Sequence, residues 1–356
     1  MKPNPYRCAG AALVTLLALA GLASAQSQED RLGAGGFDTL RIEQEDKLTV
    51  PPELAPRVWR TLRALLVDDT SFLRSIDPAF TSYWNEELFH DLYYDTPTLD
   101  LHGMRSGVRL RRRENLTDPD DRKSGRELVQ IKLDGISDHP LERGEIKYEV
   151  RRPDPVTASG DDLHPLLGPV RRSHRGRLVH RLEQLGLEPR SMRPILTVRD
   201  LRQRVYVLRE GQPFLSVSFD SASARIWWAR AAFFEIEPEL NEILFTEADA
   251  PTKAYMESVL QRIVDELHAL HPEIRQDLTP KYTRSFDLLA ERIPFLRLLV
   301  RLGLHGDQGL FVVGSTAAVL AWVAWRLARE RLRPEPARAI GMRVRHAPRA
   351  ASGRRP

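Results

Sequence analysis

Charged side chains recur at a spacing of two along several segments that otherwise look like strands. Residues 42–47 read Ile-Glu-Gln-Glu-Asp-Lys, and the same spacing returns at 109–113, 143–147, 202–204 and 235–239. In a β-strand this spacing puts all the charges of one segment on one face. One such face is usually solvated. Five segments of both signs instead predict a sheet with inward-pointing charges, around a water-filled bore that holds a polyanion and a metal ion.

Strand and helix patterns alternate through the body of the chain, residues 38–290. Apolar residues at helical spacing predict helices over about 52–67 and 251–271, and an arginine-rich stretch over 174–187 is also expected to be helical. Segments with strand patterns lie at about 39–50, 88–95, 106–114, 127–133, 143–151, 194–209, 213–220, 223–229 and 232–240. Helices outside a mostly antiparallel sheet indicate an α+β fold.

Both ends of the chain carry patterns typical of membrane targeting. Residues 1–25 have a basic start, an apolar stretch and an Ala-Ser-Ala site, which predicts a cleaved signal peptide, with an uncleaved anchor as the alternative. Residues 309–325 carry no formal charge and are followed by arginines, which predicts a membrane span, with a buried helix as the alternative. The positive-inside rule then predicts a single-pass membrane protein with a periplasmic domain and a cytoplasmic C-terminus.

These patterns divide the chain into six parts. They are a signal peptide (1–25), a linker (26–37), a large central domain (38–290), a juxtamembrane amphipathic segment (291–308), a transmembrane helix (309–326) and a basic disordered tail (327–356). The net charge of +4 lies largely in the tail and the membrane flank, so we expect no nucleic-acid partner. The only cysteine, Cys8, lies in the signal segment, so the mature chain has no cysteine chemistry.

The charged segments form an ordered set of motifs between about residues 39 and 286. They are Glu43-Gln44-Glu45-Asp46-Lys47, Tyr93-Tyr94-Asp95-Thr96-Pro97, Arg109-Leu110-Arg111, Gln130-Ile131-Lys132, Arg143-Gly144-Glu145, Arg202-Gln203-Arg204, Ser218-Phe219-Asp220, Glu235-Ile236-Glu237-Pro238-Glu239 and Lys281-Tyr282-Thr283-Arg284. The set resembles the CYTH-type domains of the triphosphate tunnel metalloenzyme superfamily, which includes triphosphatases and class IV adenylate cyclases. The tyrosine-rich motif also resembles the related polyphosphate-polymerase (VTC) branch.

The resemblance implies a fold and an activity. The fold is α+β: a closed antiparallel eight-stranded β-barrel, or tunnel, with helices packed outside, plus one C-terminal transmembrane helix. The activity is metal-dependent hydrolysis of tripolyphosphate or polyphosphate inside the tunnel, on the extracytoplasmic side of the membrane. The alternatives are a non-catalytic polyanion-binding module and a polyphosphate polymerase, but a polymerase requires a nucleotide donor on its own side of the membrane.

The motifs also supply the expected site residues. Arginine and lysine suit phosphate oxygens, and carboxylates suit Mg²⁺ or Mn²⁺. The expected catalytic residues are Glu43, Glu45 and Lys47; the phosphate-binding residues are Arg109, Arg111, Lys132, Arg143, Arg202, Arg204, Lys281 and Arg284; the metal ligands are Glu43, Glu45, Glu145, Asp220, Glu235 and Glu237. Pro238 departs from the family pattern and suggests an edge, a bulge or an early strand end, which puts Glu239 in doubt.

Overall fold

A computed structural model describes residues 39–135, 140–152 and 157–331. The strands are β1 (Arg41–Gln44), β2 (Leu48–Val50), β3 (Phe80–Asp95), β4 (Gly107–Asn115), β5 (Glu127–Leu133), β6 (Glu142–Glu149), β7 (Arg193–Arg209), β8 (Gln212–Ile226), β9 (Ala229–Leu240) and β10 (Arg275–Gln276). The main helices are α2 (Ala55–Arg63), α3 (Ser71–Ile76), α4 (Asp100–Gly103), α5 (Arg172–Gln184), α6 (Glu242–Glu247), α7 (Ala250–Leu270), α8 (Lys281–Ala290), α9 (Leu296–Arg301) and α10 (Asp307–Arg331). The predicted signal peptide and linker, and most of the predicted tail, lie outside the described residues.

The strands form one antiparallel sheet of ten, in the order β1-β6-β5-β4-β3-β7-β8-β9-β2-β10. The sheet has two ends, so the predicted closed eight-stranded barrel is wrong. The reason lies in the first strand, which is interrupted at residues 45–47. On one side of the break β1 pairs with β6, and on the other β2 pairs with β9. Between them, the described backbone reaches β9 through an isolated bridge from Glu45 to Glu239 and a hydrogen bond from Asp46 N to Pro238 O (2.9 Å).

Several elements differ in extent from their predictions. β3 begins at Phe80, eight residues before the predicted strand. β8 is one strand where two were predicted, because its ladder with β9 continues through Ser221 and Ala222. The helix predicted over 52–67 ends as α2 at Arg63 and continues as a π-helical turn, Ala64–Asp68.

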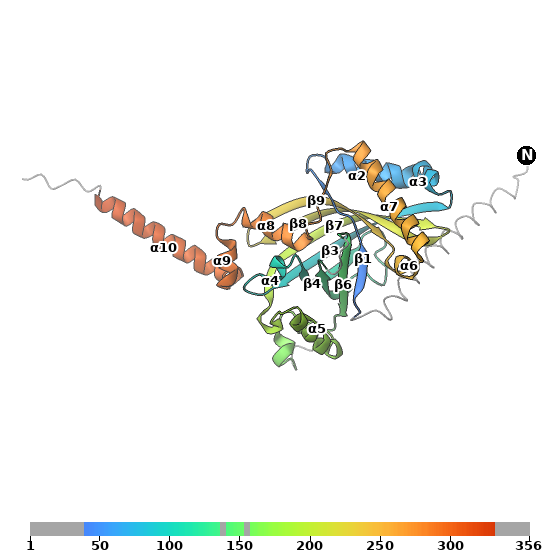
Figure 1. The fold of residues 1–356 in the computed structure, drawn as a ribbon. Helices are drawn as coiled ribbons and strands as arrows, with labels where there is room; N and C mark the ends of the chain where they lie inside the picture. Colours follow the sequence, from blue (N-terminus) through green and yellow to red (C-terminus); the bar gives the residue numbers. More distant parts are fainter. Residues whose placement is uncertain (1–38, 136–139, 153–156, 332–356) are drawn as a thin grey trace, which may run out of the picture. The chain divides into compact units, whose positions relative to one another are not determined.

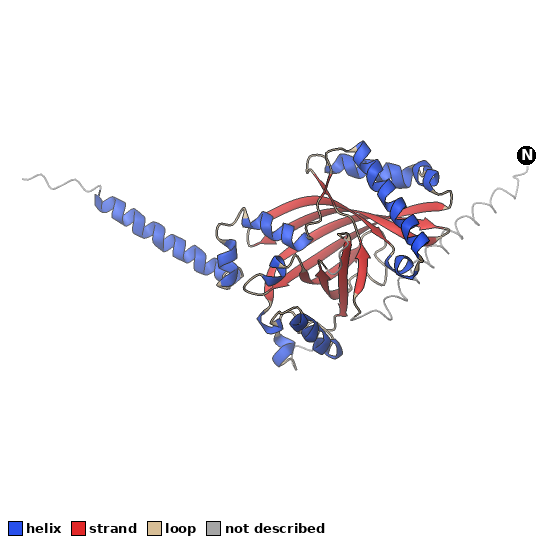
Figure 2. Ribbon diagram, viewed as in Figure 1, coloured by secondary structure: helices blue, strands red, loops and turns tan. Residues whose placement is uncertain are grey.

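The two faces of the sheet differ in chemistry, as strand alternation predicts. Val129 and Ile131 of β5 point to one face, where they join the buried core with Leu178 and Leu182 of α5. A second core packs α2 and α7 against the parts of β7, β8 and β9 around Val205, Val217 and Ile236. Figures 1 and 2 show these helices outside the curved sheet. The opposite face of each strand carries the charged residues.

The C-terminal part of the chain corrects the predicted topology. Within residues 1–310, α9 packs into the core through Leu296 and Val300, where an amphipathic juxtamembrane segment was predicted. Residues 311–331, which make up most of α10, belong to a second unit. No helix of the described chain has the length and apolar character needed to cross a membrane. The predicted span at 309–326, the single-pass topology and the periplasmic location are therefore wrong; the run without charge ends before Arg326 and is shorter than the about 20 residues of a typical span.

Candidate functional site

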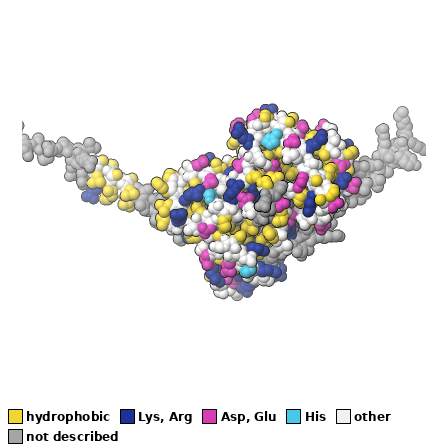
Figure 3. All heavy atoms as spheres, viewed as in Figure 1, with side chains coloured by type: hydrophobic (Ala, Val, Ile, Leu, Met, Phe, Trp, Pro, Cys, Tyr) yellow, Lys and Arg dark blue, Asp and Glu magenta, His cyan; other side chains and the backbone are white. Residues whose placement is uncertain are grey.

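The charged face of the sheet lines a cavity of about 1000 Å³. Most of the predicted site residues come together there, from six strands, the break in the first strand and the start of α8: Glu43, Glu45, Lys47, Arg109, Arg111, Lys132, Arg143, Glu145, Arg202, Arg204, Glu237 and Lys281. Three do not line it: Asp220, Glu235 and Arg284. All three are buried: Asp220 and Glu235 contact Lys281, which lines the cavity, and Arg284 contacts Glu235. The outer face in Figure 3 instead has acidic and basic side chains interspersed.

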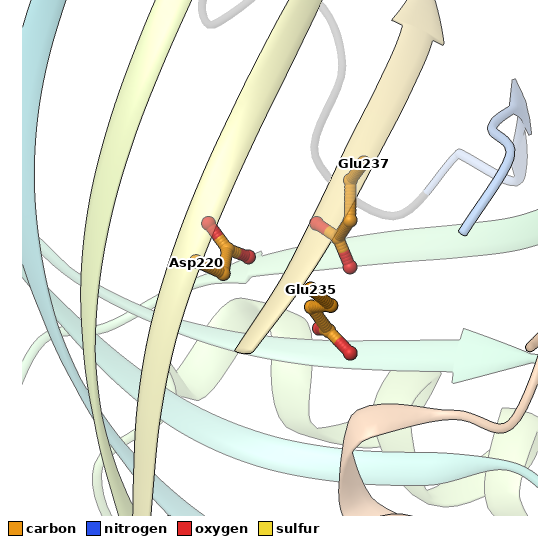
Figure 4. A group of neighbouring side chains, drawn as sticks. All are labelled: Asp220, Glu235 and Glu237. Atoms are coloured by element: carbon orange, nitrogen blue, oxygen red, sulfur yellow. The ribbon is translucent and has the colours of Figure 1, made fainter. Parts of the chain in front are cut away.

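Three carboxylates converge where Glu237 lines the cavity. Asp220 comes from β8, and Glu235 and Glu237 come from β9, which pairs with it (Figure 4). Each offers an oxygen, and the three oxygens lie within 4.8 Å of one another. This group could hold a metal ion by its geometry. The amine of Lys281, however, lies 2.7 Å from Asp200 Oδ2 and 3.0 Å from Glu235 Oε1, and also contacts Asp220.

Fixed cations already neutralise this group. Arg202 pairs with both Asp220 and Glu237, and Lys47 also pairs with Glu237. Burial alone would raise the pKa of Glu237, but Lys281, Lys47 and Arg202 outweigh it and hold that pKa well below its usual range. A metal ion bound here would have to compete with these cations.

A second acidic group lies where β1 meets β6. Lys132 Nζ donates to Glu43 Oε2 at 2.7 Å, Arg143 Nε lies 3.1 Å from Glu45 Oε1, and Lys147 pairs with Glu145. Glu45 Oε1 and Glu145 Oε2 therefore each lie in an ion pair, as the oxygens of the other acidic group do. Carboxylate oxygens fit Mg²⁺ or Mn²⁺, and a metal ion bound here would also have to compete with the fixed cations. The structure thus divides the predicted metal ligands into two groups.

Glu239 belongs to the site, contrary to the doubt raised by Pro238. β9 runs past Pro238 to Leu240, and Glu239 lines the cavity. The carbonyl of Pro238 faces the break in the first strand, so its nitrogen faces the same side and no donor is missing from the ladder with β8. Burial, together with Glu43 and Glu45, raises the pKa of Glu239 to about 7. Negative charge therefore accumulates where Glu239 lies near Glu43 and Glu45.

Sequence reasoning missed two carboxylates that hold the predicted cations. Asp91 pairs with Arg109 and Arg111, and Asp200 pairs with Lys281; both carboxylates are buried. The signal for Asp91 was its place on the same strand face as Tyr93, inside a motif that was already singled out. For Asp200 the signal was its spacing of two from Arg202.

Glu242, the first residue of α6, makes the stability of the domain depend on pH. Burial, with Glu43 and Glu145 nearby, raises its pKa to about 7, although Lys147 and Arg41 oppose this. The folded chain therefore holds this proton more tightly than the unfolded chain, so the contribution to stability is full below about pH 4.5 and is lost as the pH rises toward 7.

We expect Glu242→Gln to remove that contribution. The free energy of unfolding of the wild type should fall by about 1–3 kcal/mol more than that of the variant between pH 4.5 and 8, in chelator. Urea titrations at a series of pH values measure the difference. Parallel pH profiles for the two proteins would contradict this assignment.

No protein-family model and no curated protein match the chain. Solved structures do match. A putative adenylate cyclase from Bacillus halodurans is 16% identical, with a TM-score of 0.37 over 64% of this chain and 90% of its own. A putative adenylyl cyclase from Hippeastrum, described as having a dominant triphosphatase activity, is 19% identical, with a TM-score of 0.39 over 69% of this chain and 96% of its own. The mimivirus capping-enzyme triphosphatase is 11% identical, with a TM-score of 0.31 over 67% and 93%.

These matches agree with the resemblance to CYTH-type domains. Because their TM-scores are below 0.5, the functional argument rests on the side chains of the cavity.

Proposed function

We propose that this protein hydrolyses phosphoanhydride bonds of a triphosphate-type substrate, with tripolyphosphate or polyphosphate as the substrate class. The observation that carries the proposal is the cavity itself. Guanidinium and ammonium groups from β4, β5, β6, β7 and α8 share its wall with carboxylates from β1, β6 and β9. A pure anion site needs only the cations. Buried carboxylates beside them are costly unless they balance charge or bind a metal ion.

The basic residues suit the binding of the phosphate groups of the substrate. Arg109, Arg111 and Arg113 follow one another on the cavity side of β4, a row of about 14 Å. A linear chain of phosphates can follow such a row, and the planar guanidinium fork matches pairs of phosphate oxygens. In the hydrolysis these cations would stabilise the negative charge that builds on the transferred and leaving oxygens, and Lys47 would act next to Glu45 and Glu237.

The carboxylates suit a divalent cation. Glu43, Glu45 and Glu145, which line the cavity, would hold Mg²⁺ or Mn²⁺; Asp220 and Glu235 do not line it and are paired with Lys281. When bound, such a cation polarises phosphate oxygens and lowers the pKa of water. A carboxylate such as Glu43 or Glu45 would orient the attacking water, so no covalent intermediate with the protein is needed.

A polyanion-binding module is the second candidate. The full pairing of Asp220 and Glu235 favours it, because they can then serve charge balance alone. The preference for an inorganic substrate over a nucleotide must also come from assays, since the argument from location no longer holds.

Phosphate release by the full-length chain separates the candidates. Tripolyphosphate, longer polyphosphate and ATP would each be supplied with Mg²⁺, with Mn²⁺ or with chelator. We expect release from tripolyphosphate or polyphosphate that requires the metal ion. A folded protein that binds tripolyphosphate and releases phosphate from none of the three would instead be a binding module.

A further inference from the structure

A carboxylate that the mechanism does not use lies behind the arginines, on β3. Asp91 is the cross-strand partner of Arg111, and its side chain is completely buried. Arg111 donates to it from Nε and from Nη2, each at 2.7 Å, and Arg109 donates from Nη1 at 3.1 Å. One carboxylate thus holds two guanidinium groups from neighbouring positions on the same face of β4.

The other contacts of the two arginines fix their orientation further. Arg109 Nε donates to Gln130 Oε1 at 2.9 Å, and its Nη1 also donates to the Tyr93 hydroxyl at 3.1 Å. The guanidinium of Arg111 lies 4.0 Å from the centre of the Phe89 ring. Within the described chain this leaves one group on each side chain, Arg109 Nη2 and Arg111 Nη1, without a hydrogen-bond partner. Both arginines line the cavity.

The charge state of Asp91 supports such a role. Burial alone would raise its pKa, but Arg109 and Arg111 outweigh burial and hold that pKa at about 2. The carboxylate is therefore ionised at neutral pH. Two guanidinium charges against one carboxylate leave a net positive charge for an anion in the cavity.

We propose that Asp91 is a positioning residue, which fixes Arg109 and Arg111 so that each presents one Nη group to the phosphates of the substrate. The inference rests on the proposed function for the nature of that substrate. The rival explanation is that Asp91 only balances charge. The two explanations predict opposite changes in anion affinity. Loss of a carboxylate that only balances charge makes the cavity more positive and tightens anion binding. Loss of a carboxylate that positions the arginines leaves them misplaced and weakens anion binding.

Two variants separate these explanations. Asp91→Asn keeps the size and removes the charge, and Asp91→Glu keeps the charge and moves the carboxylate. Calorimetric binding of tripolyphosphate to the full chain in chelator is the measurement, with thermal unfolding to confirm the fold. We expect both variants to bind at least ~10-fold more weakly than the wild type, the scale of a misplaced binding group. If Asp91→Asn does not fold, Asp91→Glu decides alone.

A matched control lies outside the cavity. Asp162 also holds two arginines, Arg172 and Arg175, and Asp162→Asn should bind tripolyphosphate as the wild type does. Tighter binding by Asp91→Asn, wild-type binding by Asp91→Glu, or no binding by the wild type would overturn the inference. A wild type that binds but does not cleave tripolyphosphate would contradict only the proposed hydrolysis.

Discussion

Glu45→Ala is expected to lower the turnover of tripolyphosphate at least ~100-fold, the scale of a lost electrostatic group at a reacting centre. Glu45 lies at the break in the first strand, buried, within 3.1–3.7 Å of nitrogens of Arg143, Lys47 and Lys132. Its carboxylate lines the cavity, where it can reach a metal ion or a water. Phosphate release under saturating Mg²⁺ measures the effect.

Two comparisons make this result specific to the cavity. Glu149→Ala removes a glutamate that pairs with Arg171 and does not line the cavity, so it should leave turnover unchanged. Glu237→Ala, on the other side of Lys47, should lower turnover by a similar factor to Glu45→Ala. If Glu45→Ala folds and turns over at the wild-type rate, Glu45 has no place in the reaction.

Lys281→Met is expected to destabilise the domain by about 3–5 kcal/mol, the cost of breaking a buried ion pair. Lys281 is the first residue of α8, and its amine contacts Asp200, Asp220 and Glu235, whose side chains are fully buried. Burial, with Asp220 nearby, already raises the pKa of Asp200 despite the lysine. Removing the ammonium leaves these carboxylates with too little positive charge.

Urea unfolding at pH 7 measures this loss. Lys253→Met is the control, because Lys253 lies in the first turn of α7 outside the cavity, and its change should stay within about 0.5 kcal/mol. Adding Asp200→Asn to Lys281→Met removes one of the carboxylates that lost its counter-ion, so the double variant should recover part of the stability. Equal stability of Lys281→Met and the wild type would mean that the carboxylates are protonated in the fold and need no counter-ion.

The inward face of the sheet could be predicted from the sequence because it depends on local spacing. Charges two residues apart in Arg109–Arg113 or Glu235–Glu239 share a face in any strand. Whether the sheet closes into a barrel could not be predicted in this way. Whether residues 45–47 pair continuously depends on Pro238, nearly two hundred positions away, and on a few backbone bonds between them.

The partners of the site residues were also beyond local reasoning. That Asp91 meets Arg111 follows from the register of β3 against β4, which the motifs do not specify. The same holds for the division of the predicted metal ligands: Glu43 and Glu145 meet through the pairing of β1 with β6, whereas Asp220 and Glu235 meet through β8 and β9. Twelve of the fifteen residues named from the motifs line the cavity, and the register decided which of them touch.

The central claim is that the charged cavity cleaves a bound triphosphate in the presence of a divalent cation. The most direct test is ³¹P NMR of tripolyphosphate mixed with a stoichiometric amount of the full chain, before and after addition of Mg²⁺. We predict that the bound tripolyphosphate is unchanged in chelator and is converted to equal amounts of phosphate and pyrophosphate when Mg²⁺ is added. Bound tripolyphosphate that stays intact with either Mg²⁺ or Mn²⁺ would contradict the account.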